Sequence, residues 1–173
     1  MRGKSLVAAA VAAVVASWAF APSANAHGDI VAMRSNDSYM PGTIVVRTGE
    51  RYLYLVLDNG RAVRYPVGVG RIGKQWSGSS FISGKYVRPD WTPPAVVKRD
   101  KPSLPNLIKG GSPKNPMGAA AMTIAGGEYA IHGTNQPGSV GHFVSYGCIR
   151  MLNQDITDLF GRVSVGTRVV VTQ

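Results

Sequence analysis

Residues 131–150 read IHGTNQPGSVGHFVSYGCIR, a stretch that holds the only cysteine of the 173-residue chain and two of its three histidines. A thiol becomes a nucleophile only as the thiolate, so it needs a proton acceptor and positive charge nearby that lower its pKa from about 8.5. His132 can accept the proton, and Arg150 can supply part of the charge. The interspersed glycines let the backbone turn sharply and point N–H groups at a reacting carbonyl. The stretch therefore predicts acyl transfer by a Cys–His pair.

The residues alone leave alternatives open at each of these positions. A lone cysteine is often a buried structural residue, although a single thiol in an exported chain cannot form an internal disulfide and calls for an explanation. His132 can instead be a hydrogen-bonded core histidine, and His142 is a rival base closer in sequence to Cys148. Arg150 can clamp a substrate carboxylate or form a plain surface salt bridge.

The run from Ile131 to Ile156 resembles the active-site signature of the L,D-transpeptidase catalytic domain (YkuD-like) family. That signature has an HGT-type histidine, a spacer, and Ser/Thr-x-Gly-Cys followed by an apolar residue and Arg or Asn. Here twelve residues separate His132 from Ser145, and Tyr146 stands where many members have histidine. The resemblance extends from about residue 41 to residue 171 and includes the YPVGVGR segment at 65–71.

The resemblance implies a mainly β fold, a mixed β-sandwich with one or two short helices, over residues 41–173. It implies Cys148 as the nucleophile and His132 as the general acid/base. The tight turn around the cysteine suggests backbone N–H groups of residues 146–148 as oxyanion donors. The remaining expected site residues orient the turn or bind substrate: Ser145, Tyr146 and Gly147 for the turn, and Trp91, Gly133, Thr134, Asn135 and Arg150 for the substrate.

The activity implied by the resemblance is peptidoglycan L,D-transpeptidation, which forms 3→3 cross-links between stem peptides through a thioester on Cys148. It requires no cofactor, and the chain offers no credible metal cluster. Alternative outcomes are hydrolysis, as in an L,D-carboxypeptidase or endopeptidase, and attachment of an envelope protein through a lysine. Sortases share the His, Cys, Arg order but lack the HGT motif. A non-enzymatic wall-binding module with an inert site is the remaining alternative.

The N-terminal residues predict export. Residues 1–26 have the charged start, the apolar stretch and the Ala24-Asn25-Ala26 site of a secretory signal peptide, although an uncleaved anchor is the alternative. Their removal takes away Arg2 and Lys4 and no acidic residue, so the net charge of +10 falls to +8. A basic exported protein suits the periplasm or cell wall and an anionic envelope polymer, whereas nucleic acid is an improbable partner; the charge can also serve solubility alone. Residues 27–40 are polar without periodicity and are expected to be a flexible leader.

The rest of the chain predicts a scaffold of short strands. Hairpins are expected around Asp58-Asn59-Gly60 and between residues 119–125 and 128–132, and a closing strand at 169–171. A helix should start at Asn153 as N-cap and stop at Gly161, with Ile156, Leu159 and Phe160 on its apolar face.

Two segments invite other interpretations. Gly68 to Lys74 matches a nucleotide-binding glycine pattern, but a turn-like string follows where a helix is required, so no nucleotide is expected. Residues 85–117 hold seven of the eleven prolines and are expected to form a groove wall, with a mobile lid or disorder as alternatives.

Overall fold

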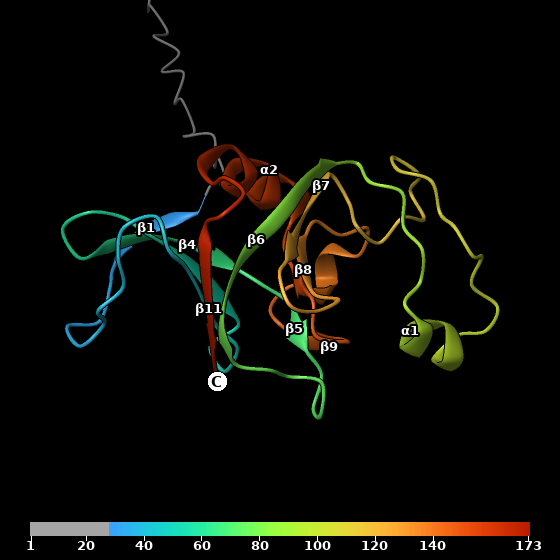
Figure 1. Ribbon diagram of the computed structural model, residues 1–173, viewed down its shortest axis with the longest axis horizontal. Helices are drawn as coiled ribbons and strands as arrows, with labels where there is room; N and C mark the ends of the chain where they lie inside the picture. Colours follow the sequence, from blue (N-terminus) through green and yellow to red (C-terminus); the bar gives the residue numbers. More distant parts are fainter. Residues whose placement is uncertain (1–27) are drawn as a thin grey trace, which may run out of the picture.

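The computed structural model describes residues 28–173, so the expected signal peptide at 1–26 lies outside the described residues. The fold is mainly β and consists of one large mixed sheet, a two-stranded ribbon and two α-helices, which confirms the expected class (Figure 1). No helix in the described part of the chain is long and apolar enough to cross a membrane.

Nine strands of the described chain form the large sheet in the order β1-β4-β3-β2-β11-β6-β7-β8-β10, and β5 pairs with β9 in the ribbon. The pairs β2–β11, β8–β10 and β5–β9 are parallel, and the other pairs are antiparallel. The strands are β1 (Asp29–Ala32), β2 (Ile44–Arg47), β3 (Tyr52–Val56), β4 (Arg61–Pro66), β5 (Val69–Gly70), β6 (Gly78–Val87), β7 (Ala120–Ile124), β8 (Ala130–His132), β9 (Phe143–Ser145), β10 (Ile149–Arg150) and β11 (Arg168–Thr172). The helices are α1 (Ala95–Asp100), α2 (Asn153–Arg162) and the 3-10 turn Pro137–Ser139.

Strand β6 joins the two halves of the sheet. Its first residues, 78–81, pair with β11, whereas residues 82–87 pair with β7. The register shifts between Ile82 and Gly84, and such a bulge bends and twists a strand. One half of the sheet can therefore fold over the other, and both halves contribute fully buried side chains such as Leu53, Ile131 and Val169 to one core.

Both hairpins form where the sequence predicts them. At the first turn, Asn59 and Gly60 have φ values of 58° and 65°, the positive values that a type I′ turn requires. The second hairpin joins β7 to β8 and pairs Ala121 with His132. Its strands carry the catalytic histidine predicted above.

The expectation that residues 27–40 form a flexible leader is wrong for residues 29–32. This short segment is strand β1, which pairs antiparallel with β4 from Asp29 opposite Arg64 to Ala32 opposite Arg61. Val31 and Met33 also pack against a small buried cluster beneath this edge of the sheet. This edge strand has only four residues, and it is held by pairing with β4. Its sequence therefore shows little of the alternation that predicts a strand.

The segment 85–117 also contains more regular structure than its composition suggests. It begins with the last residues of β6, and α1 lies within it, away from the sheet in Figure 1. Strand β6 was itself missed because residues 75–80 are rich in Ser and Gly and look like a turn. The rest of the segment consists of turns and irregular chain.

Helix α2 differs from the expectation at both ends. Asn153 is inside the helix, and no side-chain hydrogen bond caps the preceding Leu152. The Asn153 side chain has another role, described below. Gly161 does not stop the helix, which runs to Arg162. At this end of the helix, the Lys85 ammonium donates hydrogen bonds to the carbonyls of Phe160 and Val163. A cation at the C-terminus of a helix satisfies its last carbonyl groups and its dipole. Ile156 and Leu159 are buried against the sheet as predicted.

Candidate active site

The register of three short strands places His132 beside Arg150. His132 lies opposite Ala121 on β7 and opposite Arg150 on β10. Cys148 lies in the turn immediately before β10 and lines the same cavity as His132 and Arg150. Strand pairing and this turn therefore bring the predicted base, nucleophile and cation to one cavity.

The opposite face of these strands is fully apolar. Met122, Ile131 and Ile149 are each no more than 1% exposed and belong to the main core under α2. Because a shift of one residue would turn these side chains outward, burial of the core fixes the register that presents the site.

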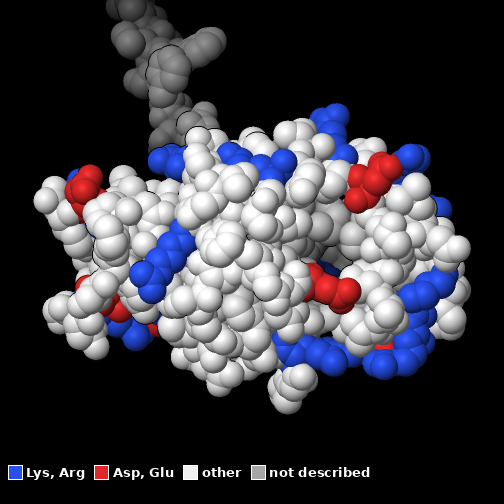
Figure 2. Space-filling view, viewed as in Figure 1, with Lys and Arg blue, Asp and Glu red and all other residues white. Residues whose placement is uncertain are grey.

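A cavity of about 310 Å³ lies over the catalytic face. Its floor includes Thr123, Ala130, His132, Cys148 and Arg150. The segment 85–117 covers it from the other side, and Figure 2 shows a hollow between the lobe that carries α1 and the body of the protein. The cavity is also lined by Trp91, Thr92, Pro94, Val96, Val97, Pro116, Met117, Gly127, Glu128, Tyr129, Ser145 and Tyr146. Trp91, Ser145, Tyr146 and Arg150 thus line the same cavity as His132 and Cys148.

His132 is 4% exposed, and its ring is fixed by the backbone. Its Nδ1 lies 2.6 Å from the carbonyl oxygen of Gly133, which can only accept a hydrogen bond, so Nδ1 carries the proton. Nε2 is left as the proton acceptor. The pKa of His132 is lowered to about 4, mainly by burial and also by the positive charge of Arg150, against the opposing effect of hydrogen bonds to the backbone of Gly133 and Pro116. The imidazole is therefore neutral at pH 7, as a base must be.

The thiol of Cys148 differs from the expectation. Burial raises its pKa above the ordinary value, while a backbone interaction with Ala130 and the charge of Arg150 lower it, and Glu128 raises it again. Burial is the largest of these effects, so the pKa of the thiol is not lowered in the free protein as the sequence analysis assumed. The resting pair is a neutral thiol and a neutral imidazole.

The turn before the cysteine is held by Ser145. Its hydroxyl donates to the carbonyl of Cys148 at 2.6 Å and accepts the N–H of Gly147 at 3.1 Å. The amide of Gly147 is therefore engaged and is a poor oxyanion donor, contrary to its expected role. The amides of Tyr146 and Cys148 remain the candidates from this turn.

Two aromatic residues that the sequence analysis missed brace the same turn. The indole Nε1 of Trp76 donates to the carbonyl of Gly147 at 3.0 Å, and its ring stacks on Tyr129 at 5.0 Å between centroids. Gly147 has a φ of 125°, and a Cβ there would collide with the Tyr129 ring, so only glycine fits. Trp76 lies 72 positions before the cysteine, and no pattern in the sequence links the two, because the fold alone brings them together.

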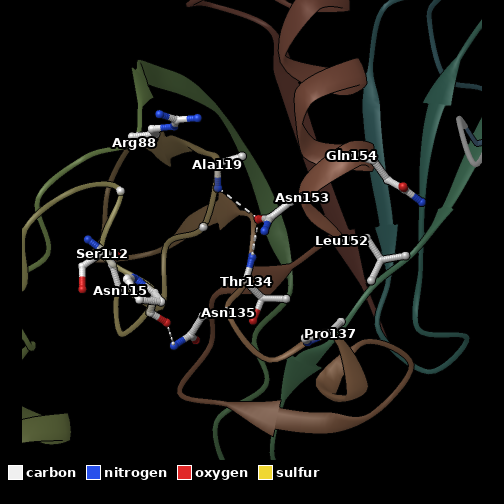
Figure 3. A pocket seen from close by; sticks show the side chains of 13 residues that line it. Arg88, Ser112, Asn115, Ala119, Thr134, Asn135, Pro137, Leu152, Asn153 and Gln154 are labelled. Carbon is white, nitrogen blue, oxygen red and sulfur yellow. Dashed lines mark hydrogen bonds between the residues drawn. The ribbon is translucent and has the colours of Figure 1, made fainter.

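Three expected substrate-binding residues lie elsewhere. Thr134 and Asn135 line a separate open cavity of about 700 Å³, and Gly133 holds the histidine through its carbonyl (Figure 3). In Figure 3 the Asn153 carboxamide reaches this loop: its Oδ1 accepts the N–H groups of Ala119 and Thr134 at 3.0 and 3.1 Å. Asn135 donates to the carbonyl of Pro113. Gly133 therefore supports the His132 ring, and neither it nor Thr134 nor Asn135 lines the cavity of Cys148.

The structure also locates His142, the rival base, and the glycine pattern at residues 68–74. His142 is exposed and does not line the Cys148 cavity. Gly68 exchanges two backbone hydrogen bonds of 2.8 Å with Arg150, and a side chain there would collide with the Ser139 carbonyl. The glycine pattern thus serves close approach to the strand that carries Arg150.

Comparison with known proteins identifies the family. The family model of the L,D-transpeptidase catalytic domain matches residues 41–171. The chain belongs to this family. Among curated L,D-transpeptidase relatives, the probable L,D-transpeptidase ErfK/SrfK of Escherichia coli K12 is 40% identical over 135 residues, covering 74% of this chain and 43% of that protein. The putative L,D-transpeptidase YkuD of Bacillus subtilis is 33% identical, covering 78% of this chain and 68% of that protein.

Solved L,D-transpeptidase structures share the fold. The catalytic domain of the Enterococcus faecium enzyme, acylated by ertapenem, has a TM-score of 0.58 at 20% identity, covering 78% of this chain and all of that chain. A Mycobacterium tuberculosis L,D-transpeptidase has a TM-score of 0.58 at 16% identity, covering 76% and 57% of the two chains. This chain spans less than half of the length of the E. coli relative described above.

Proposed function

We propose that this protein is an exported peptidoglycan L,D-transpeptidase that forms 3→3 cross-links through a thioester on Cys148. The observation that carries the proposal is the shared cavity that Cys148, His132 and Arg150 line. Membership of the L,D-transpeptidase family supports the class of reaction and stem peptides as substrates.

In the acylation step, Cys148 attacks the carbonyl carbon at the L-centre of the diamino acid in a tetrapeptide stem. The thiol proton passes to Nε2 of His132 as the sulfur–carbon bond forms, because both groups are neutral at rest. The charge that develops on the carbonyl oxygen faces the amides of the turn. The carbon–nitrogen bond then breaks, His132 returns the proton to the leaving D-alanine amine, and the thioester remains.

In the second step, the side-chain amine of a second stem attacks the thioester. The amine loses a proton to His132, the carbon–sulfur bond breaks, and the sulfur is reprotonated. One amide bond replaces another, so the reaction needs no energy input. Arg150 stands beside both catalytic groups and favours the anionic sulfur whenever it forms. Water or a lysine of an envelope protein would resolve the same thioester to a different product.

The charge of the chain supports an anionic partner such as the cell wall. Figure 2 shows basic side chains around the lobe that carries α1, whose last turn contains Lys98 and Arg99. A basic surface beside the cavity would hold the protein near an anionic polymer of the periplasm or cell wall.

Incubation with disaccharide-tetrapeptide, followed by mass spectrometry of the products, tests the proposal. We expect cross-linked dimer and free D-alanine from the wild type and unchanged substrate from Cys148→Ala. Release of tripeptide without cross-linked dimer would show that the protein is a carboxypeptidase and not a transpeptidase. Transfer of the stem peptide to an added envelope protein would favour attachment of such a protein to the cell wall. Intact substrate with the wild type would favour the wall-binding module.

A further inference from the structure

A second groove of about 680 Å³ runs beside the catalytic cavity. Its walls come from the start of β6 and from the β7–β8 hairpin. The side chains that give it chemical character are three aromatic residues and three serines: Trp76, Phe81, Tyr129, Ser77, Ser79 and Ser80.

The groove adjoins the cavity that Cys148 lines. Gly127 and Tyr129 line both hollows and form the boundary between them. A molecule that extends from Cys148 across this boundary would reach the aromatic and serine surface.

No Lys, Arg, His, Asp or Glu is among the described residues that line this groove. In a chain with a net charge of +10, this uncharged surface beside the candidate active site offers a ligand aromatic rings and hydroxyls rather than ion pairs. Aromatic faces with hydroxyls around them suit a ligand that has apolar ring faces and polar edges. A pyranose sugar has both features, because its C–H face packs on a ring and its hydroxyl and acetamido groups accept and donate hydrogen bonds.

Two of the three rings in the groove, those of Trp76 and Tyr129, are held in place before any ligand binds. Trp76 is fixed by its hydrogen bond to Gly147 and by its stacking on Tyr129, with an angle of 6° between the rings. Ser80 is fixed by its bond to the carbonyl of Ala125. Phe81 is 52% exposed, and Ser77 and Ser79 are exposed. A surface ordered in advance loses little conformational entropy on binding.

We propose that this groove binds the N-acetylated sugars of the glycan strand from which the donor stem extends. The inference rests on the proposed function, since the stem must reach Cys148 from that glycan. Three stem residues separate the sugar from the attacked carbonyl, a span of roughly 10 Å at about 3.3–3.6 Å per residue. The groove adjoins the cavity of Cys148, because Gly127 and Tyr129 line both. The groove would therefore favour donors that still carry their glycan.

Two measurements test the groove. In the first, isotope-labelled protein is titrated with chitotetraose, an uncharged oligomer of N-acetylglucosamine, and its amide and indole N–H resonances are followed. We expect shifts at the Trp76 indole N–H and the amides of residues 77–81, with at least 5-fold weaker binding in Phe81→Ala. Phe81→Tyr keeps the ring and should retain binding. Val165→Ala, a truncation at an exposed site outside the groove, should not change it.

In the second measurement, kcat/KM for disaccharide-tetrapeptide is compared with that for the free tetrapeptide. We expect the wild type to prefer the disaccharide form by about 10-fold and Phe81→Ala to lose most of this preference, with an unchanged rate on free tetrapeptide. Acylation by ertapenem checks that the catalytic groups of each variant are intact.

The outcomes separate the two proposals. Absence of groove shifts at 10 mM oligosaccharide, or equal rates with both donors, overturns the sugar site while the transpeptidase stands. Failure of the wild type to consume either donor or to react with ertapenem overturns the proposed function, and the chitotetraose titration then still decides the groove.

Discussion

His132 shows most clearly how burial sets the chemistry of this site. Enclosure by the sheet and the segment 85–117 disfavours the charged imidazolium, and Arg150 adds to the effect. Arg150 also favours the thiolate. In the proposed mechanism, the imidazole of His132 is therefore neutral and the thiol of Cys148 protonated until a substrate carbonyl is in place, which limits side reactions of a permanently charged thiolate.

This state of His132 predicts a pH dependence of stability. The folded pKa of about 4 lies below the ordinary value of 6.5, so the unfolded chain binds more protons at this residue between these pH values. The free energy of unfolding should then fall as pH decreases from about 6.5 to about 4, by on the order of 3 kcal/mol from this group. Chemical denaturation at several pH values measures it. His132→Gln cannot titrate and should show a shallower slope; equal slopes in both proteins would contradict the prediction.

Asn153 links helix α2 to the segment before β7 and to the loop that follows His132. One oxygen accepts N–H groups of Ala119 and Thr134, and Gly118 and Gly133 leave room for it because a Cβ at either position would collide with that oxygen. Asn153→Ala removes the acceptor from both amides and should lower the free energy of unfolding by about 2 kcal/mol. Asn153→Asp keeps an acceptor oxygen and serves as the matched control. A stability of Asn153→Ala equal to that of Asn153→Asp would show that these bonds do not support the loops.

The carboxylate of Asp100 connects helix α1 to the turn at residues 145–148. Asp100 accepts hydrogen bonds from the Tyr146 hydroxyl at 2.9 Å and from Arg71 at 3.0 Å, and the Arg71 guanidinium lies 4.1 Å from the centre of the Tyr146 ring. These donors lower the pKa of Asp100, with Tyr146 as the first cause. The residue at the position where many family members have histidine thus connects the nucleophile turn to the cover of the cavity.

Tyr146→Phe removes the bond to Asp100 and keeps the ring beneath Arg71. We expect hydrogen exchange in residues 95–100 to become roughly 2- to 5-fold faster, because a single exposed contact to a charged group contributes about 0.5–1 kcal/mol. Millisecond exchange with mass spectrometry gives the rates. Arg99→Ala is the control, since Arg99 also pairs with Asp100 but does not reach the catalytic turn. A comparable acceleration in the control would assign the effect to the helix alone.

At the scale of the whole molecule, β1 extends the sheet beyond the part that the family model matches. Deletion of residues 28–40 would expose the edge of β4 and the apolar surface under Val31 and Met33. We expect the free energy of unfolding to fall by about 2–4 kcal/mol, from a few net hydrogen bonds of about 1 kcal/mol each and the lost burial. Comparison with a protein lacking only residues 1–27 isolates this effect. Equal stability of the two proteins would restore the interpretation of residues 28–40 as a leader.

The sequence predicted the parts of the site that lie close together in the chain or follow strand alternation. Both hairpins and the neighbourhood of His132, Cys148 and Arg150 belong to this group. It could not predict contacts set by long-range folding, such as the bond from Trp76 to Gly147 or the carboxamide of Asn153 between two loops. It also misjudged the thiol, because the effect of burial on a pKa depends on segments such as 85–117 that cover the site from elsewhere in the chain.

The most direct test of the central claim is the intact mass of the mature protein after brief exposure to disaccharide-tetrapeptide. We predict an adduct on the wild type equal to the substrate less one D-alanine, located on Cys148 and absent from Cys148→Ala. An unmodified wild type that leaves the substrate whole, or an equal adduct on the alanine variant, would contradict acyl transfer by this cysteine.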